Sequence, residues 1–250
     1  MSIAPTIRTY LDDDHTFEAD AQITAVQDLS VAFDRSCFYP GGGGQPADEG
    51  SLELRDGTVF EVVSVHAGDD IVWHKLNAAL PADCIGRTVH MSLNRARRLA
   101  HTRYHTVLHL LNTITRRDYG GWMTGAQIDT DYSRIDFKLD KLSPALCAEI
   151  ESKVNAVIDA DRTLKAYYIS EDEFTRRDDL LRTLEVTPPV RGGQVRVVEI
   201  EGFDAQACGG THARTTAEVG RFSIFRTENK GKINKRFYVR LTCGEWDSRR

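Results

Sequence analysis

The sequence lacks several features that would identify whole classes of protein. No run approaches 18 apolar residues, so nothing in it is long enough to cross a membrane as a helix. The N-terminal residues do not show a basic stretch followed by an apolar one, which is the pattern of a secretory signal peptide. We therefore expect a cytoplasmic protein that works without a membrane.

Cysteine is scarce, and the five cysteines are widely and irregularly spaced with no Cys-x-x-Cys pair. An odd number at such spacing argues against a disulfide framework and for reduced thiols. Most reduced cysteines are small buried residues. Any cysteine with a function here is then a metal ligand or a nucleophile.

Basic residues are fewer than acidic ones, which gives a net charge of −5, and the charges are unevenly distributed along the chain. Residues 1–94 hold 15 Asp and Glu against 5 Lys and Arg, whereas the last thirty residues hold 9 Lys and Arg against 3 Asp and Glu. This asymmetry indicates either two regions, the second suited to an anionic partner, or a solvated surface of uneven sign.

Residues 1–92 consist of short strand-like runs separated by Gly, Asp and Asn. The segment "RDGT" (55–58) predicts a hairpin, because Asp-Gly readily takes the positive φ that a two-residue turn requires. Several short strands at this spacing favour a small barrel or sandwich. We therefore expect a small β-barrel-like domain over 1–92, which includes a Gly-rich loop.

Residues 93–250 mix helices with strands. Apolar residues recur at helical spacing over 95–117, which predicts the clearest helix of the chain. A second helix is predicted over 143–161, with Ser143 as its N-cap, and a third, more polar one over 170–184. The strand-like segments between them indicate an α+β second domain, a two-layer arrangement of helices on a mostly antiparallel sheet.

Histidine is scarce too, yet three of the eight histidines fall in the first predicted helix. They are His101, His105 and His109, and residues four apart on a helix face can both reach one Zn²⁺. Cys208 and His212 repeat this spacing around two glycines. One thiolate and three imidazoles form a tetrahedral set that zinc prefers. Spacing alone leaves open whether His101 or His109 joins His105, although His101 lies in a basic stretch suited to solvent or phosphate.

Several segments of the chain together resemble one known family, the alanyl-tRNA editing proteins of the AlaX type. The matches run from about residue 30 to residue 242 and point to the medium-length class, which carries a Gly-rich motif and a small β-domain. This class is related to the editing domain of alanyl-tRNA synthetase. The segments are "FYPGGGGQPADEG" (38–50), "RYHTVLHLL" (103–111), "SRIDF" (133–137), "ACGGTHA" (207–213) and "VGRFSIFRTENKGKINKR" (219–236).

The resemblance implies a zinc-containing deacylase that acts in trans on alanine tRNA mischarged with serine or glycine. The family's zinc ligands fall on His105, His109, Cys208 and His212, which leaves His101 as a surface residue or a neighbour of the ligands. No protein partner is implied. The alternative is a zinc-stabilised module that binds tRNA without hydrolysing it.

Ester hydrolysis needs a positioned water and stabilisation of the oxyanion. The helix motif is "HTVLH" and lacks the glutamate base of the HExxH zinc peptidases, which argues against a peptidase. Candidates for the polar groups that place the water are Thr106, Gln127 and Thr211. With four protein ligands a zinc site is closed, and with three it keeps a position for water or substrate; the sequence leaves this open.

The segment "GGGGQP" lacks the Lys-Ser/Thr ending of a phosphate-binding P-loop. By resemblance this loop lies against the editing pocket, where it would sense the hydroxyl of serine and so help reject alanine. The candidate substrate-binding residues of the loop are Gly42, Gly43, Gly44 and Gln45.

The phosphates of tRNA require basic side chains. The candidates are Arg97, Arg98, Lys230, Lys232 and Arg236. Aromatic residues are sparse among them, so stacking on unpaired bases is not strongly indicated.

Overall fold

The structure is a computed structural model that describes residues 3–68, 70–81, 83–181, 188–231 and 233–242.

The chain divides into two compact units. Unit 1 comprises Met1–Gly42 and Pro46–Leu99, and unit 2 comprises Gly43–Gln45 and Ala100–Arg250. This division groups three residues of the Gly-rich loop with the second half of the chain. The expected domain boundary between residues 92 and 93 stays a prediction.

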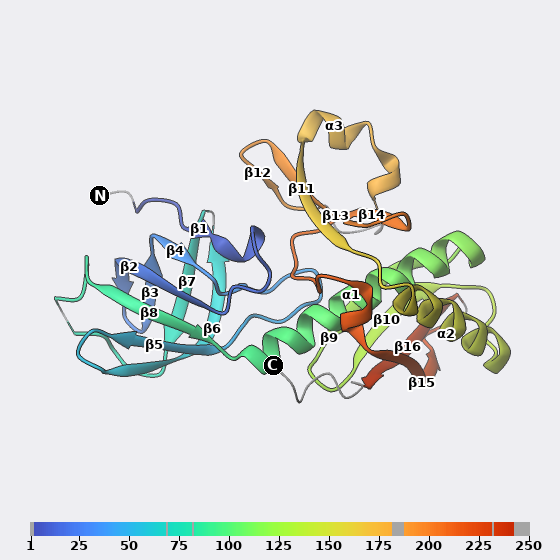
Figure 1. Cartoon of the computed structure of the whole chain (residues 1–250), viewed down its shortest axis with the longest axis horizontal. Coiled ribbons are helices and arrows are strands. Elements are labelled where there is room, and N and C mark those ends of the chain that lie inside the picture. Colours follow the sequence, from blue (N-terminus) through green and yellow to red (C-terminus); the bar gives the residue numbers. More distant parts are fainter. Residues whose placement is uncertain (1–2, 69, 82, 182–187, 232, 243–250) are drawn as a thin grey trace. The chain divides into compact units, whose positions relative to one another are not determined.

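Unit 1 is built on a closed six-stranded barrel whose neighbouring strands are all antiparallel, in the order β2-β3-β7-β6-β5-β8 (Figure 1). Alternate side chains of β7 and β8 are buried, as Val89, Met91 and Leu93 are in β8, and the barrel is filled by its own apolar residues. The barrel-like expectation is confirmed. The strands are β2 (Glu18–Gln27), β3 (Ser30–Phe33), β5 (Gly50–Leu54), β6 (Val59–Gly68), β7 (Ile71–Leu76) and β8 (Thr88–Leu93); a parallel pair, β1 (Ile7–Arg8) and β4 (Arg35–Ser36), lies outside the barrel.

The predicted hairpin joins β5 to β6, but its loop is longer than two residues. The backbone N–H of Leu54 donates to the carbonyl of Thr58 at 2.9 Å, and that of Gly57 donates to the carbonyl of Leu54 at 2.9 Å. The turn at Arg55–Gly57 therefore holds three residues, and its only positive φ is the +84° of Gly57. The aspartate caps the turn instead, because Asp56 Oδ1 accepts the N–H of Thr58 at 2.9 Å.

The larger sheet of unit 2 is antiparallel throughout, in the order β15-β16-β10-β9 (Figure 1). Two helices share one apolar core with it: Val107 and Leu111 of the first helix and Val154 of the second pack with Ile135 and Phe237 of the sheet. The two-layer α+β expectation is confirmed. The elements are α1 (Arg95–Tyr119), α2 (Pro144–Asp159), β9 (Trp122–Ile128), β10 (Ser133–Lys138), β15 (Arg221–Asn229) and β16 (Asn234–Thr242).

The predicted helices α1 and α2 are confirmed, and α2 begins as expected. Ser143 Oγ accepts the N–H of Leu146 at 3.1 Å, and Pro144 occupies the first turn. Helix α1 differs from expectation in its surroundings. Nearly every side chain from His101 to Thr115 is buried, so α1 is a central helix with no solvated face along this stretch.

A smaller antiparallel sheet completes unit 2. The third helix predicted from the sequence, over residues 170–184, is short in the structure. Ser170 caps α3 (Glu171–Thr175), and a 3₁₀ turn follows at Asp178–Leu180. None of the side chains of α3 is buried, so no apolar stripe extends it. Residues 182–184 of that prediction lie outside the described residues. The strands are β11 (Leu164–Ser170), β12 (Val190–Arg191), β13 (Gln194–Ile200) and β14 (Asp204–Ala207).

In the described part of the chain, no helix combines the length and the apolar character that crossing a bilayer requires.

Candidate metal centre

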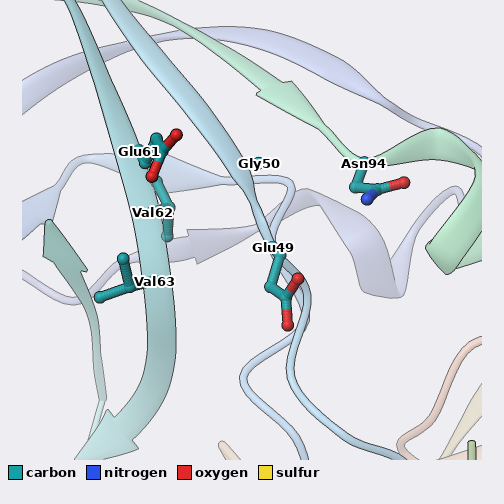
Figure 2. A pocket seen from close by; sticks show the side chains of 6 residues that line it. All are labelled: Glu49, Gly50, Glu61, Val62, Val63 and Asn94. Atoms are coloured by element: carbon teal, nitrogen blue, oxygen red, sulfur yellow. The ribbon is translucent and has the colours of Figure 1, made fainter. Parts of the chain in front are cut away.

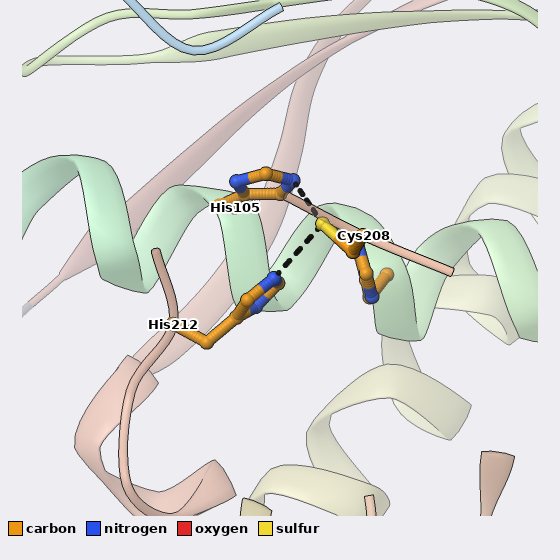
Figure 3. A group of neighbouring side chains, drawn as sticks. His105, Cys208 and His212 are labelled. Atoms are coloured by element: carbon orange, nitrogen blue, oxygen red, sulfur yellow. Dashed lines mark hydrogen bonds between the residues drawn. The ribbon is translucent and has the colours of Figure 1, made fainter. Parts of the chain in front are cut away.

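Four side chains from two distant segments converge in unit 2. His105 and His109 project from neighbouring turns of α1, and Cys208 and His212 come from the loop that follows β14. Their potential ligand atoms all lie within 4.8 Å of one another. Figure 3 shows the thiol of Cys208 between the rings of His105 and His212. The structure therefore brings together all four residues that the resemblance names as metal ligands.

The spacing of these atoms fits a tetrahedral ion. Cys208 Sγ lies 3.5 Å from His105 Nε2 and 3.3 Å from His212 Nε2. Zn–S and Zn–N bonds of about 2.3 and 2.0–2.1 Å at tetrahedral angles put sulfur about 3.6 Å from nitrogen. The three rings are also mutually close, with centroids 4.4–5.1 Å apart. The donor set and its spacing fit zinc without a change of fold.

Burial keeps the imidazoles uncharged. The pKa values of His105 and His212 both lie well below the ordinary value of 6.5, chiefly because burial disfavours the cation and secondly because neighbouring histidines repel it. Neutral imidazoles have a nitrogen lone pair to offer, so both rings are ready to bind a metal at neutral pH. Cys208 is only half-buried, which leaves one side of the group open.

Of the two glycines in the loop between Cys208 and His212, Gly210 is required for steric reasons. A Cβ on Gly210 would overlap the ring of His105, so only glycine lets the loop lie against this ring. Arg196 of β13 holds the same loop, because its guanidinium donates to the carbonyls of Gly210 at 2.8 Å and Cys208 at 3.2 Å. The position of the thiol thus depends on strand β13 as well as on its own loop.

Thr106 lies directly behind His212. Its hydroxyl oxygen is 3.2 Å from His212 Nδ1 and accepts the N–H of Ala213 at 3.0 Å. When Nδ1–H donates to this hydroxyl, the Nε2 lone pair faces the thiol of Cys208. The sequence predicted that Thr106 places a water molecule. Its observed contacts are those of a residue that orients the ring of His212.

Gln45 and Thr211 lie behind His105. The side-chain oxygen Gln45 Oε1 is 2.8 Å from His105 Nδ1, and Gln45 Nε2 donates to Thr211 Oγ1 at 2.8 Å. Both side chains are buried, with 2% and 0% of their surface exposed. The preceding Gly44 has a φ of +87°, and a Cβ there would lie 2.7 Å from the carbonyl oxygen of Ala126. This glycine lets the loop approach β9 closely and so delivers Gln45 to the metal group.

The other candidates lie elsewhere. Gln127 is exposed, and its side-chain oxygen Oε1 accepts a hydrogen bond from Arg134 Nε at 2.9 Å. The structure therefore does not bring this side chain to the four converging residues. Lys230 is exposed beside Glu228, and Arg236 forms a two-pronged ion pair with Asp136, with both N–O distances 2.6 Å. The remaining candidates of the loop, Gly42 and Gly43, carry no side chain. Lys232 lies outside the described residues.

Arg98 does not suit the phosphate-binding role expected for it. Its guanidinium is fully buried in unit 1, where Nε and a terminal nitrogen donate to Asp48 and another nitrogen to the carbonyl of Asp14 at 2.9 Å. With no exposed surface it cannot meet a phosphate, and it acts as a structural ion pair. Arg97 is partly exposed and pairs with Glu49 at 3.2 Å.

Of the two roles expected for His101, the structure contradicts the surface one, because the side chain is fully buried. The basic stretch around it suggested solvent, but α1 is covered along this length. Repulsion from His101 contributes to lowering the pKa of His105, so His101 is an electrostatic neighbour of the converging group, as the second expected role has it.

Unit 1 contains a separate hollow of about 470 Å³. Figure 2 shows its lining residues, among them the carboxylates of Glu49 and Glu61 and the amide of Asn94. None of the four converging residues lines it, so this hollow is distinct from the metal group.

Two residues around the group could not be found from spacing. The amide of Gln45 was expected to meet substrate, and its contact with His105 joins segments 60 residues apart. Arg196 carries no motif signal within "VRVVEI", and only the pairing of β13 with β14 brings it to the loop. Finding Arg196 would have required the sheet register, and finding the contact of Gln45 would have required the path of the loop.

Comparison with known proteins gives the chain a family. Residues 195–238 match the model of the threonyl and alanyl tRNA synthetase second additional domain, and residues 6–97 match that of the class II (A) tRNA synthetases. The alanine–tRNA ligase of Korarchaeum cryptofilum is 35% identical over 89% of this chain and 25% of its own length. The alanyl-tRNA editing protein AlaX-M of Methanosarcina acetivorans is 36% identical over 93% of this chain and 97% of its own length, and that of Saccharolobus solfataricus is 30% identical over 93% and 98%. The chain belongs to the AlaX-M family of alanyl-tRNA editing proteins.

Proposed function

We propose that this protein is a deacylase that hydrolyses the ester of alanine tRNA mischarged with serine, and also with glycine. Water attacks the ester carbonyl, and the products are the free amino acid and a tRNA with its 3′-terminal hydroxyl restored. The observation that carries the proposal is the group of His105, His109, Cys208 and His212 in a chain that aligns with editing proteins over nearly their whole length. We expect the reaction to take place in the cytoplasm.

We propose zinc as the cofactor and these four residues as its ligands. The nitrogen-rich donor set with one thiolate favours zinc over magnesium or calcium, which prefer oxygen. When bound, zinc would supply a Lewis acid that orients and polarises the amino acid part of the substrate. The absence of a carboxylate base from "HTVLH" favours water placement by neighbouring polar groups. Thr106 and Thr211 stay predictions for that role, whereas Gln127, which lies away from the four residues, is not proposed for it again.

Contacts to the substrate are proposed for two parts of the chain. The Gly-rich loop at residues 42–45 is proposed to face the amino acid, since Gln45 lies directly against the ligand His105. The exposed or partly exposed Arg97, Lys230 and Arg236, together with Lys232, are proposed to meet the tRNA phosphates.

A deacylation assay with three substrates tests the proposal. Purified, zinc-loaded protein is given Ser-tRNA(Ala), Gly-tRNA(Ala) and Ala-tRNA(Ala), and release of the amino acid is followed. We expect rapid loss of serine, measurable loss of glycine and retention of alanine. Equal stability of all three esters with and without protein contradicts the proposal.

One observation favours the second candidate, a zinc-stabilised module that binds tRNA without hydrolysis. Four protein ligands complete a tetrahedral site, as they do in structural zinc centres. The same assay separates the two, because such a module binds tRNA(Ala) and leaves all three esters intact.

A further inference from the structure

The orientation of one buried amide determines which nitrogen of His105 faces the metal group. The backbone N–H of Thr211 points at the amide of Gln45 at 3.2 Å, and an N–H can only donate. The atom of Gln45 that it meets is therefore the oxygen Oε1. The nitrogen Nε2 then faces the hydroxyl of Thr211 at 2.8 Å, where it donates.

The same oxygen fixes the protonation of His105. Oε1 lies 2.8 Å from His105 Nδ1, and since a carbonyl oxygen only accepts, Nδ1 carries the proton. The lone pair is then on Nε2, which lies 3.5 Å from Cys208 Sγ and faces the other ligands. The ring is thus held in the tautomer and orientation that metal binding at Nε2 needs.

We propose that Gln45 is a positioning residue that sets the metal affinity of the centre through His105. This inference rests on the proposed zinc site. Gln45 is 2% exposed and its amide contacts His105 Nδ1 and both the hydroxyl and the backbone N–H of Thr211, so the contact is built into the fold. Metal-bound histidines commonly donate their other N–H to such a partner, and loss of that partner typically weakens metal binding about 10–100-fold.

Competition with a chelator measures the zinc affinity of the whole protein and its variants. Gln45→Leu removes both the acceptor and the donor at nearly the same volume, and we expect zinc to bind about 10–100-fold more weakly. Gln45→Glu keeps an oxygen facing His105 Nδ1–H and is expected to restore affinity to within about threefold of wild type. The exposed Gln27 provides the matched control, because Gln27→Leu places the same side chain on strand β2 of unit 1, which supplies none of the four ligands, and should leave affinity unchanged.

Substitution of cobalt for zinc adds a spectroscopic readout that a loss of stability alone would not change. The visible absorption of Co²⁺ reports ligand geometry, so wild type and Gln45→Glu should share one spectrum while Gln45→Leu differs. Wild-type affinity and spectrum in Gln45→Leu, or a Gln45→Glu variant as weak as Gln45→Leu, overturns the inference.

A further variant covers the case in which Gln45→Leu does not fold. Thr211→Val removes the acceptor of the amide and is expected to weaken zinc binding about threefold to tenfold; wild-type affinity there also counts against the inference. Wild-type protein that binds no zinc refutes the proposed cofactor itself, so the two failures are distinguishable.

A second inference concerns the face of the larger sheet opposite the helices. Three rings gather there: Tyr132 lies 6.1 Å from Phe225 and 6.2 Å from Tyr238, and the latter two are 6.2 Å apart. Arg226 stacks on Tyr238 at 4.7 Å and Arg240 on Phe225 at 4.6 Å. We call these five residues the aromatic–arginine face.

A bulge in β15 creates this arrangement. The register between β15 and β16 shifts between Ile224 and Arg226, so Phe225 and Arg226 are both exposed although they are adjacent in the strand. Tyr132 and Phe225 are 40% and 44% exposed, an unusual fraction for such large rings. Sequence alternation alone places these two neighbours on opposite sides of the sheet, which is why the aromatic cluster was not expected.

Charge on this side of the sheet favours a polyanion. The acids Asp136 and Glu228 pair with Arg236 and Arg226, while Arg134 and Arg240 add positive charge beside the rings. Arginines stacked on exposed aromatic rings are typical of surfaces that bind single-stranded nucleic acid, where phosphates meet the cations and bases stack on the rings.

We propose that the aromatic–arginine face binds an unpaired segment of the tRNA. The choice of tRNA rests on the proposed function, but the measurement does not need deacylation. Fluorescence anisotropy follows the binding of uncharged tRNA(Ala) to the whole protein at several salt concentrations. We expect Phe225→Ala with Arg240→Gln to weaken binding at least tenfold and to reduce its salt dependence, with zinc content unchanged.

The control variant is Tyr168→Ala, which removes a ring of similar exposure, 43%, from the smaller sheet. It should bind tRNA(Ala) as wild type does. Equal affinity of the double variant and wild type overturns the inference, as does an equal loss in Tyr168→Ala. Because binding is measured without turnover, an inactive wild-type protein that still binds tRNA refutes only the deacylase proposal.

Discussion

Each of the two units buries histidine, and the contacts of the rings differ in a way that separates structure from function. In unit 1, His74 lies in the barrel with 0% exposure, between the rings of Phe33 and Phe38 at 5.0 and 5.2 Å. Its Nε2 is 2.8 Å from Ser36 Oγ and its Nδ1 is 3.3 Å from the carbonyl of Val31. Both ring nitrogens of His74 have protein partners, so this histidine has nothing left to offer a metal.

The histidines of unit 2 use their nitrogens differently. His105 and His212 each have one ring nitrogen against a polar group behind them, Gln45 and Thr106, while the other faces the thiol of Cys208. A buried imidazole is therefore not evidence of a site by itself. The evidence is that His105 and His212 each turn their second ring nitrogen toward the thiol of Cys208, with His109 beside them.

The largest expected effect comes from removing a ligand. Cys208→Ala and His105→Ala should each weaken zinc binding on the order of 100-fold or more, beyond the usual loss for a residue that only orients a ligand. Titration against a chelator measures this. His74→Gln should bind zinc with wild-type affinity, as should His101→Ala, because neither belongs to the converging group. Loss of zinc in His74→Gln would contradict the assignment of His74 as a purely structural histidine.

The next effect tests a purely structural buried charge in unit 1. Arg98→Ala leaves Asp48 buried without its cation and should lower the free energy of unfolding by about 3–5 kcal/mol. Urea unfolding measures the change. Zinc affinity of the folded variant should match wild type, and a full loss of zinc with unchanged stability would reverse the roles assigned to Arg98.

The pH dependence of the free energy of unfolding should show the contribution of His74. Burial lowers its pKa to about 3, so between pH 6.5 and 3 the unfolded chain binds a proton that the folded chain does not. Stability therefore falls as the pH falls through this range, and His74 contributes about 2 kcal/mol of the loss between pH 7 and pH 5. Urea unfolding of wild type and His74→Gln at both pH values isolates this share. Parallel pH profiles would contradict the assignment.

The smallest effect separates stability from metal binding inside unit 2. Ser143→Ala removes the cap of α2 and should cost about 1 kcal/mol in urea unfolding. Its zinc affinity should stay that of wild type, since α2 supplies none of the four ligands. A matching loss of zinc would show that the centre depends on the overall stability of the unit.

Local patterns predicted much of this molecule. Apolar spacing located α1 and α2, turn residues located the β5–β6 hairpin, and two four-residue spacings with the family motifs named four residues that the structure brings together. These features are encoded within a few neighbouring residues, so short-range physics is enough to find them.

What the sequence did not predict depends on long-range packing. The basic surroundings of Arg98 and His101 suggested solvent, but both are buried because other segments cover that part of α1. The contact of Gln45 with His105 and the gathering of Tyr132, Phe225 and Tyr238 need a loop closure and a strand bulge that leave no periodic signal. Tertiary contacts decide such features.

X-ray absorption at the zinc edge tests the central claim most directly. For the purified protein with one zinc bound per chain, the account predicts three nitrogen ligands at about 2.0–2.1 Å and one sulfur ligand at about 2.3 Å. The sulfur contribution should disappear in Cys208→Ala. A zinc shell of nitrogen and oxygen alone in the wild-type protein would contradict the assignment of His105, His109, Cys208 and His212.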